Sequence, residues 1–193
     1  MAAISIDNPR AKTTAAVRRW VPWICAYTGA RVNEITQLRA EDVRVEDGIP
    51  FIEISPEAGS VKTHKARTVP LHDDLIRQGF IEFAAKVQGP LFYDPSRSKG
   101  GSDAHPQYAK AGERLAAWVR TLGVDDPNVA PNHGWRHRFI TLSRSVGMRE
   151  DISNSITGHT SGEVRNHYGL SPLKAQKLEI DKLPTNPLSV RLT

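Results

Sequence analysis

Hydrophobic residues recur along most of the chain at the spacing of an amphipathic helix. The first such run lies between residues 13 and 28 and has apolar side chains at steps of three and four, namely Val17, Trp20, Val21, Ile24 and Tyr27. Pro22 interrupts this run and predicts a kink, or a helix that starts nearer Trp20. Gly29 predicts the end of this helix, and a second helix is predicted from Arg31 to Leu38.

Two short segments have the composition of β-strands. They cover residues 49–54 and 67–71 and are rich in branched side chains. Pro50 and Pro70 fit best at strand ends or on a sheet edge, because proline cannot donate a ladder hydrogen bond. The polar stretch from Ser55 to Ala66 lies between the two segments and predicts a hairpin.

The pattern along the remainder of the chain predicts further helices and completes the prediction of the fold class. Helices are predicted over residues 73–87, 106–122, 133–146, 149–156 and 161–167, with loops over 89–102 and 127–132. A last amphipathic helix over 172–183 contains Leu173, Leu178 and Leu183 and ends before Pro184. The prediction is therefore an α+β domain over residues 13–183, mainly α-helical with one small antiparallel sheet, between a linker (1–12) and a tail (184–193).

Composition narrows the class of protein. The 193 residues suffice for one domain, and 26 Lys and Arg against 21 Asp and Glu give a net charge of +5, which weakly favours a polyanionic partner. Cys25 is the only cysteine and has apolar neighbours, so a buried core residue is expected rather than a nucleophile. The start of the chain does not resemble a signal peptide and no apolar run reaches membrane-span length. We therefore expect a soluble, cytoplasmic protein with no membrane partner.

Four separated segments contain groups that can act on a phosphate. They are Thr28-Gly29-Ala30-Arg31-Val32-Asn33-Glu34-Ile35, Val61-Lys62-Thr63-His64-Lys65-Ala66-Arg67-Thr68-Val69-Pro70-Leu71, His133-Gly134-Trp135-Arg136-His137, and Thr157-Gly158-His159 followed by Tyr168. Each has an ordinary explanation when taken alone. Arg31 and Glu34 could form a surface helix pair worth roughly a few tenths of a kcal/mol, and Tyr168 could be a half-buried core residue. Their common order and spacing carry more information than any single segment.

Taken together, the four segments resemble the catalytic domain of the tyrosine recombinase (phage integrase) family. That family has an arginine in a TG-x-R-x-x-E segment, a hairpin lysine, H-x-x-R, GH and a tyrosine, in this order. The matching residues here are Arg31 with Glu34, Lys62, His133 with Arg136, His159 and Tyr168. The 23-residue step from Arg136 to His159 and the nine-residue step to Tyr168 are typical of the family. Leucine is commoner where Trp135 and Thr157 stand, but neither position supplies a catalytic group.

The resemblance implies the DNA breaking-rejoining fold and a metal-independent reaction. DNA would be cleaved and religated through a 3′-phosphotyrosine on Tyr168. Arg31 and Arg136 would hold the phosphate, since guanidinium groups stay charged and grip phosphate oxygens in a bidentate fork. His133 would take and return the tyrosine proton, because the pKa of histidine lies nearest to neutrality.

The remaining family positions imply supporting roles. His159 would hydrogen-bond the scissile phosphate, and Lys62 would protonate the leaving 5′-oxygen, with Lys65 as the competing candidate. Glu34 would orient the arginines or its own helix rather than touch DNA. The other histidines are interpreted as solvated or structural: His64, His72, His105, His137 and His167.

Double-stranded DNA is the implied partner, bound mainly through its phosphates and therefore in a salt-dependent way. Possible contacts are Arg39, Arg44, Lys65, Arg67, Lys99, Lys110, Arg114 and Arg138. The resemblance also implies a homotetramer on DNA, in a bacterial or phage-encoded system. In relatives the C-terminal helix docks on a neighbouring subunit, and packing in cis is the alternative here. No cofactor, metal or small-molecule substrate is expected, because no glycine-rich phosphate loop, carboxylate cluster or ligand-spaced His/Cys set is found.

Other interpretations of the sequence remain open. Family members usually have a separate helical domain before the catalytic one, so about a dozen residues before the first helix suggest a fragment or a minimal member. A type IB topoisomerase uses similar groups, although the compact spacing and the GH histidine favour a recombinase that integrates, excises or resolves DNA. A catalytically silent DNA-binding regulator and a basic helical protein with coincidental motifs are the further alternatives.

Overall fold

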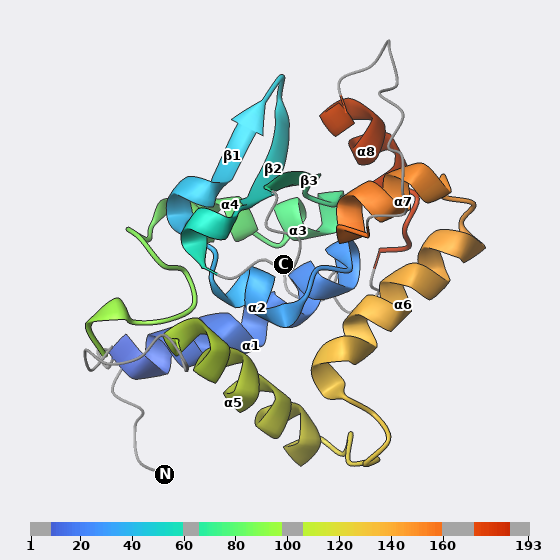
Figure 1. Cartoon of the computed structure of the whole chain (residues 1–193). Coiled ribbons are helices and arrows are strands. Elements are labelled where there is room, and N and C mark those ends of the chain that lie inside the picture. Colours follow the sequence, from blue (N-terminus) through green and yellow to red (C-terminus); the bar gives the residue numbers. More distant parts are fainter. Residues whose placement is uncertain (1–8, 60–65, 98–105, 160–171, 186–193) are drawn as a thin grey trace.

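A computed structural model describes residues 9–59, 66–97, 106–159 and 172–185 of the chain. One small sheet packs beside the helices, and its β1–β2 hairpin projects away from them (Figure 1). The elements are α1 (Pro9–Thr28), α2 (Val32–Thr36), β1 (Val43–Glu46), β2 (Ile49–Ile54), β3 (Arg67–Pro70), α3 (Asp73–Arg77), α4 (Phe80–Ala85), α5 (Gln107–Thr121), α6 (Pro131–Ser145), α7 (Glu150–Thr157) and α8 (Pro172–Ile180), with short 3-10 helices at Ala40–Asp42, Pro56–Ala58 and Pro95–Arg97. The predicted mainly helical α+β class is confirmed.

The sheet is antiparallel and its strands lie in the order β1-β2-β3. The predicted strands and their antiparallel pairing are confirmed, with Ile52 of β2 opposite Val69 of β3. Strand β1 was not predicted. It pairs with β2 through a tight turn at Asp47 and Gly48, both of which have positive φ, as two-residue hairpin turns require. As an edge strand with a mostly exposed burial pattern, β1 lacks the apolar run that identified β2.

Helix α1 forms the centre of the core. Val21, Ile24 and Cys25 are completely buried, and the helix is packed by α2, α5 and α6. It begins at Pro9 and continues through Pro22, so the expected start near residue 13 or Trp20 is wrong. Burial of the apolar face offsets the hydrogen bond that the proline removes. Burial also raises the pKa of the Cys25 thiol, which agrees with its interpretation as a core residue.

Two predicted helices differ from those observed. The segment over residues 73–87 is divided into α3 and α4 at Gly79, which adopts a left-handed conformation. The break lets the buried Phe80 pack on Trp20, with ring centroids 5.3 Å apart, so tertiary packing overrides the continuous helical pattern. Helix α2 ends at Thr36 rather than at Leu38. The helix predicted over residues 161–167 lies outside the described residues.

Helix α8 packs in cis, against β3 and α7. Leu173 and Leu183 are buried in the core of their own chain, whereas Leu178 is 61% exposed. The three leucines therefore do not share one exposed face. His72 Nε2 lies 3.0 Å from the carbonyl oxygen of Leu183, and Lys177 Nζ donates to the carbonyl of Leu71 at 3.0 Å. None of the helices within the described ranges is long and apolar enough to cross a membrane.

Candidate functional site

Four segments that are distant in the sequence meet at one place in the fold. They are the end of α1 with the turn into α2, the start of β3, the middle of α6, and the end of α7. In Figure 1, α7 lies between β3 and α6, and direct contacts join α7 to both. The predicted residues Arg31, Glu34, Arg136 and His159 lie on these segments.

Arg136 is the buried centre of this cluster. It is only 8% exposed, and its Nη1 donates to the carbonyl oxygens of Gly29, at 2.5 Å, and Thr157, at 2.9 Å. Its Nη2 lies 2.9 Å from Nδ1 of His159, and the Thr157 hydroxyl lies 3.2 Å from the same nitrogen. Arg136 therefore joins the ends of α1 and α7 and contacts the predicted phosphate-binding histidine.

Gly29 makes this approach possible. Its φ of +61° lies in the left-handed region, and a Cβ atom there would lie 2.6 Å from Cδ1 of Phe139 and 2.9 Å from Cγ2 of Thr157. Such distances are well inside van der Waals contact. The absence of a side chain at Gly29 thus lets the end of α1 rest on α6 and α7, with its carbonyl directed at Arg136.

Glu34 is a buried carboxylate that joins two further arginines. It is 1% exposed and accepts from Arg67 Nη2 at 2.7 Å, Arg67 Nη1 at 3.3 Å and Arg31 Nη1 at 3.2 Å. Its Oε2 also accepts from the Arg31 backbone N–H at 2.9 Å. Burial raises the pKa of Glu34, but the hydrogen bond and charge of Arg67, together with Arg31, hold it below its usual range. Glu34 is therefore ionised at neutral pH.

The position of Arg67 differs from its sequence interpretation as a DNA contact. Its side chain is 10% exposed, and its Nε donates to the carbonyl of Ile156 in α7 at 3.1 Å. Sequence reasoning could anticipate that a buried Glu34 needs a cationic partner. It could not identify which basic residue of the hairpin segment would face inward.

The cluster has an excess of positive charge. It contains three guanidinium groups and one carboxylate: Arg31 and Arg67 pair with Glu34, and Arg136 is close enough for its pKa to be affected by all three. The pKa of Arg136 is lowered, first by burial and then by repulsion from Arg31 and Arg67, with Glu34 opposing this effect. The side chain of Arg31 is 26% exposed, and His159 is exposed. This arrangement favours an anion that approaches from the side of these two residues.

The other residues that the sequence predicted for the site or for DNA contact lie outside this cluster or outside the described residues. His133 is exposed on the first turn of α6, three residues before Arg136, and borders a hollow of about 360 Å³ between α2, α5 and α6. Lys62, Lys65 and Tyr168 lie outside the described residues. Two predicted DNA contacts are ion-paired within the protein. Arg39 pairs with Asp42 (2.7 Å) and Glu41 (3.2 Å), and Arg44 pairs with Glu53 (2.9 Å).

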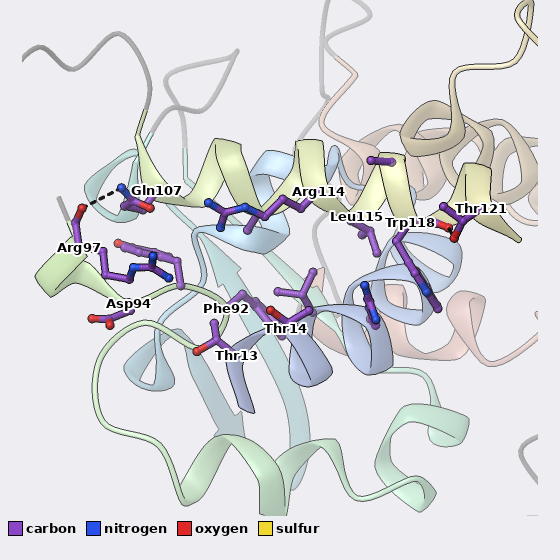
Figure 2. Close-up of a pocket in the computed structure, with 15 residues that line it drawn as sticks. Thr13, Thr14, Phe92, Asp94, Arg97, Gln107, Arg114, Leu115, Trp118 and Thr121 are labelled. Carbon is purple, nitrogen blue, oxygen red and sulfur yellow. Dashed lines mark hydrogen bonds between the residues drawn. The ribbon is translucent and has the colours of Figure 1, made fainter. Parts of the chain in front are cut away.

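A second hollow lies between α1, α5 and the segment over residues 92–97, away from this cluster (Figure 2). It has a volume of about 410 Å³ and an apolar wall that includes Phe92, Leu115 and Trp118. None of the cluster residues lines it. Across the part of the chain that the structure describes, no group of three or more His, Cys, Asp or Glu side chains could hold a metal ion.

The fold and the arginine cluster define the class of protein, a tyrosine recombinase catalytic domain. The chain belongs to the phage integrase family, whose model matches residues 3–171. No curated protein matches the chain.

Solved structures of similar fold include an integrase from mycobacterium phage Brujita. The TM-score is 0.60 at 18% identity, and the match covers 96% of this chain and 61% of that chain. The chain therefore spans less than two thirds of that integrase. Two structures of XerH site-specific recombinase also match, one a pre-cleavage complex with difH substrate and the other a post-cleavage complex with palindromic difH substrate. Each match has a TM-score of 0.46 and 24% identity, and covers 83% of this chain and 42% of that chain.

Proposed function

We propose that this chain is a site-specific recombinase that cleaves and rejoins double-stranded DNA through a 3′-phosphotyrosine on Tyr168. Family membership supports this reaction class. The observation that carries the proposal is the excess positive charge of this cluster, in which Arg31 and Arg67 share the single carboxylate of Glu34 while Arg136 contacts His159. A phosphodiester is the anion that such a cluster suits.

The arginines would stabilise the charge that develops on the phosphate. As a nucleophile attacks phosphorus, negative charge builds on the non-bridging oxygens, and fixed cations lower the barrier because they need no reorganisation. Arg136 is held by two carbonyl acceptors, and Arg31 is held through Glu34. Exposed His159 would donate a further hydrogen bond to the same phosphate.

The covalent step balances without an external energy source. The Tyr168 oxygen attacks phosphorus and loses its proton to His133, while the bond from phosphorus to the 5′-oxygen breaks. Lys62, or Lys65 in its place, gives a proton to that 5′-oxygen. Religation reverses each transfer when a 5′-hydroxyl attacks the phosphotyrosine. Because the phosphoester energy is conserved in the intermediate, ATP is not consumed.

Recombination needs two DNA sites and therefore several copies of the catalytic domain. We include in the proposal a homotetramer on DNA, in the cytoplasm of a bacterial host, as the family resemblance implies. Strand exchange between two labelled duplexes distinguishes this activity from the relaxation of a supercoiled plasmid by a single chain, which would favour a topoisomerase.

Covalent trapping on nicked DNA tests the proposal. Wild-type protein, Tyr168→Phe and the matched control Tyr93→Phe are incubated with a panel of candidate nicked duplexes in EDTA and run on denaturing gels. Tyr93 is half-buried beside Tyr108 and loses the same hydroxyl. We expect a protein–DNA adduct with wild type and Tyr93→Phe and none with Tyr168→Phe. An adduct with Tyr168→Phe, or none with wild-type protein that a mobility shift has shown to be DNA-bound, would contradict the proposal.

A further inference from the structure

Arg67 connects three elements of the candidate site. It opens β3, pairs through two nitrogens with Glu34 of α2, at 2.7 and 3.3 Å, and donates from Nε to the carbonyl of Ile156 in α7, at 3.1 Å. All three guanidinium nitrogens are therefore engaged within the protein. With its side chain 10% exposed, Arg67 has few donors left for DNA.

Arg31 makes fewer contacts within the protein than Arg67 does. Among the described contacts of its side chain, Arg31 uses one nitrogen, Nη1, on Glu34 at 3.2 Å. A guanidinium carries five N–H donors, so most of the fork of Arg31 stays available to an anion. Arg67 leaves the Arg31 donors available because it donates two hydrogen bonds to the buried Glu34 carboxylate, one to each oxygen.

Glu34 without Arg67 would be an uncompensated buried charge. Leaving one member of a buried pair alone is strongly unfavourable, and the nearest remaining cation is Arg31. The carboxylate would then draw the Arg31 fork inward, away from a bound phosphate. The carbonyl of Ile156 would also lose its donor.

The end of α7 is fitted closely to Arg67. Gly158 has φ +68°, and a Cβ atom there would lie 3.1 Å from Cζ of Arg67. His159 follows directly, and its backbone N–H donates to the carbonyl of Asn154 at 3.0 Å. The position of Arg67 is thus coupled to the turn that presents His159.

We propose that Arg67 is a positioning residue for the recombinase reaction: it occupies Glu34, so that Arg31 remains free to bind the scissile phosphate, and it fixes the end of α7 before His159. This inference rests on the proposed function. Arg67 does not touch the reacting atoms. It acts through Glu34 and through the α7 backbone.

Rates of adduct formation on nicked DNA test this role. Four proteins are compared: wild type, Arg67→Gln, the double variant Glu34→Gln/Arg67→Gln, and Arg77→Gln. Arg77 is the matched control because it also pairs with a buried carboxylate, that of Asp74 at 3.2 Å, on a helix apart from the cluster. Each rate is measured with saturating DNA and normalised to the folded fraction determined by urea unfolding.

We expect Arg67→Gln to slow adduct formation by roughly 10- to 100-fold, as misplaced catalytic groups do, with less than a threefold change in DNA affinity. The double variant should be faster than Arg67→Gln, because the uncompensated carboxylate is gone, and Arg77→Gln should match wild type. Since Arg67 lowers the pKa of Glu34, its removal raises that pKa, and protonation of Glu34 would relieve the uncompensated charge. As the pH is lowered from neutral, the rate of Arg67→Gln should therefore approach that of the double variant. The double variant should lack this added pH dependence.

Two outcomes would overturn the role of Arg67 alone. One is a wild-type adduct together with an Arg67→Gln rate within twofold of wild type. The other is a double variant no faster than Arg67→Gln, which would place the effect outside Glu34. Failure of the wild-type protein to form an adduct would instead overturn the proposed function and this inference together, so the two failures are distinguishable.

Discussion

Replacing Gly29 with alanine adds a single methyl group at the point where α1, α6 and α7 meet. The new Cβ would lie 2.6 Å from Cδ1 and 2.9 Å from Cγ of Phe139, and 2.9 Å from Cγ2 of Thr157. Phe139 is completely buried and Thr157 is 1% exposed, so neither can turn out to solvent. The end of α1 must shift, and with it the carbonyl that accepts from Arg136.

The expected loss of stability has two parts. An L-residue in the left-handed region costs about 1–2 kcal/mol, and forcing a methyl group into a packed core costs about 1–3 kcal/mol. Alanine regains about 0.4–1 kcal/mol by restricting the unfolded chain. We therefore expect Gly29→Ala to lower the free energy of unfolding by roughly 1–5 kcal/mol in total.

Gly147→Ala is the matched control. Gly147 has φ +65°, close to the +61° of Gly29, and no atom lies within 4 Å of the position of its Cβ. The control therefore retains the backbone penalty and the unfolded-state gain but lacks the steric part. Urea unfolding of both variants should place Gly29→Ala about 1–3 kcal/mol below Gly147→Ala. Equal stabilities would refute the reasoning, because the close approach at Gly29 would then have no energetic consequence.

Two further predictions concern the attachment of α8. Burial lowers the pKa of His72 below its ordinary value of 6.5. As the pH falls through 6.5, His72 therefore takes up a proton in the unfolded chain but not in the folded chain. This uptake favours the unfolded chain, so the free energy of unfolding decreases below that pH. Between pH 8 and 5 the urea midpoint of wild type should therefore fall, whereas that of His72→Asn should fall less; parallel curves would contradict this. Leu173→Ala should lower the free energy of unfolding by about 2–5 kcal/mol and Leu178→Ala by no more than about 0.5 kcal/mol, because Leu173 is buried and Leu178 is 61% exposed. Equal losses in urea unfolding would mean that α8 does not pack in cis as described.

The sequence was sufficient to predict which segments form the candidate site, but not which side chains contact one another within it. Motif order singled out Arg31, Glu34, Arg136 and His159, and the fold brings these residues to one place. The role of Arg67 could not be predicted, because its contact with Glu34 spans 33 positions and depends on how β3 meets α2. Local patterns carry no information about such a contact.

Secondary-structure elements were likewise predicted correctly where a local pattern determines them, and missed where tertiary packing does. The buried strand β2 has a strong apolar run and was predicted with its observed bounds. The exposed edge strand β1 lacks that run, although the Asp47-Gly48 pair could have indicated its hairpin. The break between α3 and α4 at Gly79 serves the packing of Phe80 on Trp20, a contact that the helical period alone could not reveal.

Mapping the covalent bond between protein and DNA identifies the nucleophile of the proposed reaction. The adduct from the nicked-DNA reaction would be digested with nuclease and trypsin, and the nucleotide-bearing peptide identified by mass spectrometry. Trypsin releases residues 166–174 as one peptide that contains Tyr168 and no other tyrosine. We expect a nucleotide attached to Tyr168 of this peptide. Attachment to a peptide containing Tyr93 or Tyr108, or to any residue other than Tyr168, would contradict it.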